Sequence, residues 1–177
     1  AAGIGLQTAG LLCAGASGPG SPNFRAIVES WNGSAWTEIA DLSSNRIRVG
    51  ATGTQTAGIV FGGTDGPSNL ALTERWDGSS WTEVADLNTA RRQLAGDGTT
   101  TSALAFGGLY PSSTRLAITE TWNGTSWAEV NNLNTARYQL AGAGTDSTSA
   151  IAFGGNKPPN TASANTEDWN GATWVEV

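Results

Sequence analysis

Residues 117–130 read AITETWNGTSWAEV, and this stretch decides the fold. Two short runs rich in β-branched and aromatic side chains flank the dipeptide Asn123-Gly124. Such a step favours a tight turn, because glycine tolerates the positive φ that the turn requires. The stretch therefore predicts an antiparallel β-hairpin.

A similar hairpin sequence occurs four times in the 177-residue chain. The first members of the tryptophan pairs lie 45, 46 and 47 residues apart, and the pairs are Trp31/Trp36, Trp76/Trp81, Trp122/Trp127 and Trp169/Trp174. An Asn-Gly or Asp-Gly step lies inside each pair, at Asn32, Asp77, Asn123 and Asn170. Two further segments precede each hairpin, and in the third repeat they read LNTARRQLAGDGT (87–99) and SALAFGG (102–108).

Each repeat thus supplies four short β-strands, and an antiparallel unit of four strands at this period is typical of a propeller blade. We predict an all-β fold, a β-propeller of four four-stranded antiparallel blades in a single domain over 1–177. The blades are expected at about 1–48, 49–93, 94–139 and 140–177. Membership of these four blades in a larger propeller stays open.

The repeat resembles the kelch repeat at several positions. An arginine follows a short turn (Arg46, Arg91, Arg137), an apolar strand ends in Phe-Gly-Gly (Phe61, Phe106, Phe153), and the second tryptophan of each pair fits the pattern. The first aromatic position departs, since kelch repeats usually carry Tyr where this chain carries Trp. The first repeat departs too, with Cys13 in place of the Phe and Ala14-Gly15 in place of Gly-Gly. The resemblance implies a kelch-type propeller with the first segment innermost and the second Trp-bearing strand outermost.

The tandem units are also similar in style to repeats in tail or fibre proteins of marine bacteriophages. The chain has no Met, and its first residues lie inside a first segment, so we expect a longer product that was trimmed or cut. Four units in phase could close alone, pair into eight, or form part of a longer array.

The eight tryptophans have two interpretations. Aromatic faces stack on sugars, which would make them a carbohydrate site. We favour the structural interpretation, because a large ring at a fixed repeat position is what packing between repeats requires. All eight are therefore predicted to be repeat core, and Trp36, Trp81, Trp127 and Trp174 to be mostly buried.

Two glutamates recur in each hairpin, as Glu29/Glu38, Glu74/Glu83, Glu120/Glu129 and Glu167/Glu176. A four-residue loop would place the two carboxylates opposite each other, which is unfavourable. We therefore predict a two-residue loop, in which Glu29 pairs with Trp36. The glutamates could form cation sites, but a solvated edge or ion pairs with Arg46, Arg91 and Arg137 are favoured, because hard cations need about six or more oxygens.

The composition of the chain excludes several classes of partner and catalytic site. The net charge is −6 with only nine Lys and Arg, so we expect no nucleic-acid partner, and with no long apolar run we expect no membrane insertion. The chain has no His and one cysteine, Cys13, which excludes Ser-His-Asp and Cys-His catalysis and a His or thiolate metal site. We predict no enzyme activity, no cofactor and no metal.

The repeats differ most between the Gly-Gly pair and the third segment. These stretches are Ala16–Ile27, Thr64–Leu72, Leu109–Ile118 and Asn156–Asn165. By the kelch resemblance they all join the second strand to the third, so they emerge on one side. We predict a binding rim there, formed by Phe24, Arg25, Tyr110, Arg115 and Lys157, with drift of unconstrained loops as the alternative.

The favoured function is a non-catalytic structural or recognition module on the outside of a virion or cell. It would bind a partner protein, a surface glycan or other subunits of an assembly. An intracellular kelch adaptor that binds a protein partner is the alternative, and a fragment of a carbohydrate-active enzyme is a third. Scarce Lys and abundant Ser, Thr and Gly favour the extracellular interpretation.

Overall fold

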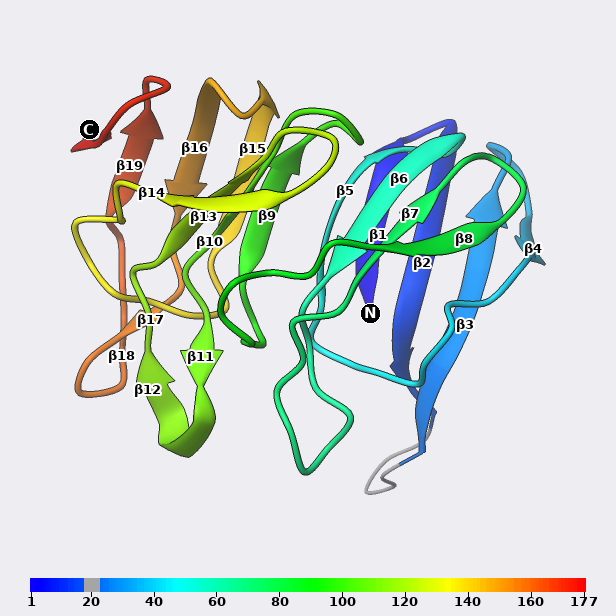
Figure 1. Cartoon of the computed structure of the whole chain (residues 1–177), viewed down its shortest axis with the longest axis horizontal. Helices are drawn as coiled ribbons and strands as arrows, with labels where there is room; N and C mark the ends of the chain where they lie inside the picture. The colour runs from blue at the N-terminus through cyan, green and yellow to red at the C-terminus, as the bar shows by residue number, and fades with distance from the viewer. Residues whose placement is uncertain (18–22) are drawn as a thin grey trace.

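The computed structural model describes residues 1–17 and 23–177, which form four antiparallel sheets arranged as the blades of a β-propeller (Figure 1). In each blade, four strands hydrogen-bond in chain order. No α-helix occurs among the described residues, and a 3₁₀ turn at Pro111–Ser113 is the one helical element assigned there. The predicted all-β propeller of four blades is confirmed.

The strands follow the four predicted repeats. The first blade holds β1 (Ala2–Leu6), β2 (Ala9–Ala16), β3 (Phe24–Trp31) and β4 (Trp36–Glu38), and the second holds β5 (Gly50–Thr54), β6 (Ala57–Phe61), β7 (Thr73–Trp76) and β8 (Trp81–Val84). The third holds β9 (Ala95–Gly98), β10 (Ala103–Phe106), β13 (Thr119–Trp122) and β14 (Trp127–Val130), and the fourth holds β15 (Ala141–Asp146), β16 (Ser149–Phe153), β19 (Thr166–Trp169) and β20 (Trp174–Glu176). Two small hairpins, β11/β12 (Leu109–Tyr110, Thr114–Arg115) and β17/β18 (Asn156–Lys157, Thr161–Ala162), lie in loops.

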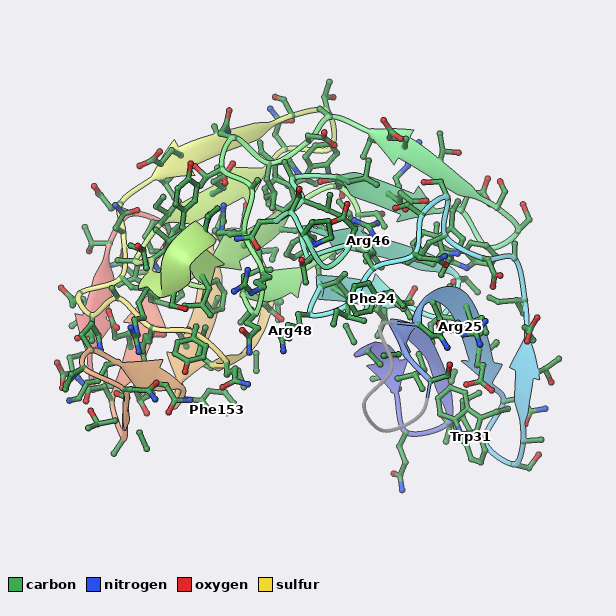
Figure 2. The ribbon with its side chains drawn as sticks, turned by 90° about the horizontal axis from the view of Figure 1, so that it is seen from below. Phe24, Arg25, Trp31, Arg46, Arg48 and Phe153 are labelled. Carbon is green, nitrogen blue, oxygen red and sulfur yellow. The ribbon has the colours of Figure 1, made fainter. Side chains whose placement is uncertain are left out.

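The blades follow one another in an arc. The first strands β1, β5, β9 and β15 are innermost and border a glycine-rich cavity of about 370 Å³. The first and fourth blades lie on either side of the opening of the arc, where Figure 2 labels Trp31 and Phe153. Among the described residues, no sheet joins a strand of the first blade to one of the fourth.

The hairpin register differs from our prediction. Trp31 faces Trp36, and Glu29 faces Glu38, so the loop holds four residues and not two. The same register holds in the other blades. The reason is an Asx turn, in which Asn32 Oδ1 accepts hydrogen bonds from the amides of Ser34 and Ala35, both at 2.9 Å. The facing tryptophan rings pack 5.4 Å apart in this register.

The repulsion between facing glutamates is relieved by arginine. In the second, third and fourth blades, the Glu on the third strand is buried and forms an ion pair, in the pairs Arg46–Glu74, Arg91–Glu120 and Arg137–Glu167. Its partner on the fourth strand is exposed. One of the two favoured interpretations of the glutamates, ion pairs with these arginines, is therefore correct for the third-strand members, Glu74, Glu120 and Glu167.

Each of these repeat arginines forms hydrogen bonds with two neighbouring blades. The Arg91 carbonyl accepts a hydrogen bond from the amide of Gly63 in the second blade, while its guanidinium reaches Glu120 and the Ala105 carbonyl in the third. Burial lowers the pKa of Arg91 from its usual value, and Glu120 acts against that change. The second oxygen of Glu120 accepts from the amide of Asn88 at 2.7 Å, so the carboxylate is fully engaged.

The apolar core lies between the blades. Phe61 of the second blade packs edge-on against Trp127 of the third at 5.1 Å, and Phe106 packs in the same way against Trp174 at 5.0 Å. A Cβ on Gly96 would overlap the Phe61 ring, so glycine there makes room for the aromatic pair. These contacts explain why Trp127 and Trp174 are buried, as predicted.

The other two outer tryptophans are less buried than predicted. Trp36 is 48% exposed, so the prediction that it is a buried core residue is wrong. The face it occupies lies at the end of the arc, where no described blade covers it. Trp81 is only partly buried, because the residue that faces it from the first blade is Cys13 and not Phe. Phe153, at the other end, is 42% exposed for the same reason as Trp36.

Candidate functional site: the loop face

The four variable loops emerge at one end of the propeller, which is the lower end in Figure 1. We call this end the loop face and define it by the loops 16–27, 64–72, 109–118 and 156–165 and by Arg48, Gln93 and Gln139. Residues 18–22 of the first loop lie outside the described residues. The common position follows from the topology, since each loop joins the second strand of a blade to the third.

Phe24 and Arg25 begin strand β3 on the first blade (Figure 2). The Phe24 ring lies against Gly66 in the loop of the second blade, where a Cβ would come within 2.7 Å of the ring. Phe24 therefore joins two loops and offers less free aromatic surface than predicted. Arg25 is exposed, and its Nε donates to Ser17 Oγ at 3.1 Å.

Tyr110 and Arg115 lie in the β11/β12 hairpin of the third blade. Tyr110 is 47% exposed and is more accessible than Phe24, the other aromatic predicted for the binding rim. Arg115 instead reaches the fourth blade, where its Nη2 donates to Asn160 Oδ1 at 3.1 Å and its guanidinium lies over the Tyr138 ring at 5.5 Å. Tyr138 donates to the same Asn160 oxygen at 2.8 Å, so these loops are cross-linked.

Lys157 lies in the β17/β18 hairpin of the fourth blade, paired through the backbone with Thr161. The structure thus places all five predicted residues on the loop face but over three blades. Tyr110, Arg115 and Lys157 belong to adjacent loops, while Phe24 and Arg25 lie at the far end of the arc.

Sequence reasoning missed the inner part of the loop face. Arg48, Gln93 and Gln139 lie just before the inner strands and have left-handed backbones, with φ of 60°, 56° and 53°. Their main chains form a ladder, because the Gln93 amide donates to the Arg48 carbonyl at 2.8 Å and the Gln139 amide to the Gln93 carbonyl at 2.9 Å. The available signal was a long polar residue two positions after each repeat arginine. Non-glycine residues in this conformation concentrate at functional sites.

The loop face collects positive charge on an acidic protein. Of the nine cationic side chains, three are buried in ion pairs, Arg75 is on β7, and the other five are on or beside the loop face: Arg25, Arg48, Arg92, Arg115 and Lys157. None of these five forms an ion pair with an acidic side chain among the described residues. Arg92 is instead held by Asn69, whose Oδ1 accepts from its Nη1 at 2.5 Å. The four loop segments contain a single acid, Asp65.

The described residues contain no group of three or more His, Cys, Asp or Glu side chains that could hold a metal ion. No helix in the described part of the chain has the length and apolarity to cross a bilayer. The indole of the first tryptophan in each pair is not on the loop face, since Trp76 Nε1 and its repeat equivalents donate to carbonyls of the inner hairpin turns at the opposite end.

A solved structure described as "Structure of YjhT" superposes on the chain with a TM-score of 0.72 at 11% sequence identity. The match covers 87% of this chain and 52% of the other, so this chain spans about half of that protein's length. The chain has the fold of a β-propeller. At this identity the likeness establishes the fold of the propeller alone. No protein-family model matches the sequence, and the search of curated proteins found no match.

Proposed function

We propose that this propeller is a non-catalytic recognition module whose loop face binds an acidic patch on a partner protein. The observation that carries the proposal is the gathering of five unpaired cations on one end of a molecule with a net charge of −6. Such an asymmetry has a cost, because like charges repel, and binding of an anionic surface would relieve it.

The form of the loop face supports a protein partner over a glycan. Sugars commonly stack on open aromatic rings, yet Phe24 packs on Gly66 and Arg115 covers the Tyr138 ring. Tyr110 is therefore the accessible aromatic among the described loop residues. Arginine and tyrosine side chains spread over several loops are instead common in protein interfaces.

The finer features of the repeat support a kelch-type module on a virion or cell surface, with the intracellular adaptor as its alternative. The repeat arginine, the Phe-Gly-Gly strand end and the second tryptophan each make a contact between blades, so these shared kelch positions have a structural role here. Scarce lysine and the absence of His and Met suit a durable external part.

The experiment compares two charge variants. Arg48, Arg92 and Arg115 are replaced by Gln together, and Arg75→Gln is the matched control, since Arg75 is exposed but lies on β7 away from the loop face. Partners are captured from the source material by cross-linking, and their affinities are measured at two salt concentrations. We expect the triple variant to bind about tenfold more weakly and to lose most of the salt dependence, because rim charges act through the long-range field.

The control should bind as the unmodified protein does. Equal losses in the triple variant and in Arg75→Gln would contradict a loop-face site. Binding to a glycan array that depends on Tyr110 and is insensitive to salt would favour the glycan hypothesis instead.

A further inference from the structure

One face of the first blade has the same construction as faces that are covered elsewhere in the molecule. We call it the open N-side face and define it by Gly3, Leu12, Glu29, Trp31 and Trp36. In the second, third and fourth blades, the equivalent face receives a side chain from the second strand of the preceding blade and an arginine from the linker that joins the two blades.

The open N-side face has the groups that bind the arginine. A cavity of about 490 Å³ lies there, and its lining includes Ala14, Ile27 and Glu29. The sheet register makes these the equivalents of Gly62, Leu72 and Glu74, since Glu29 lies between Leu12 and Glu38 as Glu74 lies between Val60 and Glu83.

In the second blade those three equivalents hold Arg46. Its Nη1 donates to the carbonyls of Gly62 at 3.2 Å and Leu72 at 2.6 Å, and its Nη2 donates to Glu74 at 2.7 Å. Ala14 even keeps the left-handed backbone of Gly62, with φ of 61° against 66°. The first-blade cavity therefore offers a guanidinium the same carboxylate and the same backbone positions that hold Arg46 in the second blade. Arg25 also lines it, but its Nε is directed to Ser17.

The aromatic part of the face specifies the second contact. Gly96 and Gly142 make room for Phe61 and Phe106, whereas Ala51 occupies the equivalent position opposite the smaller Cys13. The first blade has Gly3 at this position, and a Cβ added there would meet nothing closer than the Leu11 carbonyl oxygen at 3.9 Å, so the space beside Gly3 is open.

Trp36 lines a pocket together with Gly3 and is 48% exposed, whereas the rings of Trp127 and Trp174 are covered by phenylalanine. In the later blades, the phenylalanine ring lies between a glycine and a tryptophan. The open N-side face has the same glycine and tryptophan, so it fits Phe and not Cys.

We propose that the open N-side face binds another blade of this repeat type, which inserts a phenylalanine between Gly3 and Trp36 and a linker arginine against Glu29. A second copy of this chain fits less well. Its fourth blade offers Phe153, but its repeat arginines are already paired with Glu74, Glu120 and Glu167, so it would leave Glu29 without a guanidinium.

The test joins one repeat to the full chain. A duplicate of residues 94–139 placed directly before Ala1 brings a copy of Arg137 three positions ahead of Ala1, the same spacing that separates Arg137 from Leu140. We expect the midpoint of thermal unfolding to rise by at least about 5 °C, since repeat proteins gain stability from each interface between neighbours. The Trp36 indole N–H, identified with Trp36→Phe, should become protected from hydrogen exchange.

Three substitutions and one matched control substitution make the test specific. In the added repeat, changing the Arg137 copy to Gln or the Phe106 copy to Ala should each remove part of the rise. In the first blade, Glu29→Gln should abolish the difference in unfolding midpoint between the Arg and Gln versions of the added repeat. The matched control Glu38→Gln, on the exposed strand β4, should leave that difference unchanged.

Equal midpoints for the Arg and Gln versions of the added repeat would overturn the proposal, as would an arginine effect that survives Glu29→Gln. The mass of the unextended chain in solution tests whether a second copy binds this face. A monomer agrees with the proposal, whereas a stable oligomer that both Trp36→Ala and Phe153→Ala dissolve would show that a second copy covers this face.

Discussion

The interface between the second and third blades and the open N-side face of the first blade are built from the same repeat positions, yet their residues differ in burial. Trp127 is 5% exposed and Trp36 is 48% exposed, although both follow equivalent turns and face an equivalent tryptophan across the hairpin. The difference comes from the neighbouring blade, which supplies Phe61 to Trp127. In a repeat fold, burial is therefore a property of the interface and not of the repeat sequence.

The interface between the first and second blades is an intermediate case. Cys13 replaces the phenylalanine, Ala51 replaces the glycine that would accommodate it, and Trp81 stays partly buried. The two substitutions compensate in volume, so this interface is closed but contains no phenylalanine–tryptophan pair.

The largest expected effect separates the tryptophans. Trp127→Ala should lower the free energy of unfolding by about 4 kcal/mol, because it removes a buried ring and leaves a cavity. Trp81→Ala should cost about 3 kcal/mol, and Trp36→Ala about 2 kcal/mol, since about half of that residue's surface is already in water. Chemical denaturation with urea measures all three. Equal losses at Trp36 and Trp127 would mean that the first blade is covered.

The next effect separates the glutamates. Glu120→Gln removes one partner of a buried ion pair and leaves Arg91 unpaired, so it should cost about 3 kcal/mol. Glu29→Gln, at the same repeat position on the open N-side face, should cost less than about 0.5 kcal/mol because the side chain is partly solvated. Urea denaturation at pH 7 again provides the measurement, and a loss at Glu29 comparable to that at Glu120 would contradict the comparison.

A thiol reports on the first interface. Burial raises the pKa of Cys13 to about 12, although Arg46 acts in the opposite direction. At pH 8 the thiol is therefore protonated, and its full burial makes it inaccessible to reagents. Iodoacetamide should label it at least about 100-fold more slowly than in urea, through local opening alone. Mass spectrometry over time measures the rate. Rapid labelling of the folded chain would show that the first and second blades separate readily.

The smallest effect concerns a turn. Hydrogen bonds from the amides of Ser80 and Ser79 lower the pKa of Asp77 to about 2. Since the folded pKa lies below that of the unfolded chain, ionised Asp77 stabilises the fold above about pH 4, and this contribution is lost as the pH falls toward 2. Asp77→Asn should leave the thermal midpoint at pH 7 nearly unchanged, because Asn fills this position in the other three repeats, and should reduce its fall between pH 4 and pH 2. An unchanged acid profile would contradict the assignment.

The sequence was sufficient for the fold because the repeat signal is redundant. Trp pairs, Asn-Gly steps and Phe-Gly-Gly ends each indicate the same four-stranded unit. The hairpin register was predicted wrongly, because repulsion between Glu29 and Glu38 does not decide it. The Asx turn of Asn32 favours the four-residue loop, and in the later blades an arginine neutralises the third-strand glutamate.

The loop face was predictable in position but not in composition. The topology implied by the kelch resemblance placed Tyr110, Arg115 and Lys157 at one end. The inner cations Arg48 and Arg92 escaped notice because they lie in the linker, next to arginines with a structural role. Their contribution depends on the convergence of the linkers around the axis, which no local pattern encodes. The exposure of Trp36 was likewise invisible, since it depends on the neighbouring blade.

Hydrogen exchange of the eight indole N–H groups tests most directly whether the neighbouring blade sets burial. Trp127 and Trp174 donate to the buried hydroxyls of Thr73 and Thr119, at 3.2 and 3.0 Å. NMR of the intact chain, with peaks assigned by single Trp→Phe variants, should show these two indoles exchanging most slowly, Trp81 faster, and Trp36 fastest of the four outer tryptophans. Protection of Trp36 equal to that of Trp127 in the monomeric chain would contradict the account.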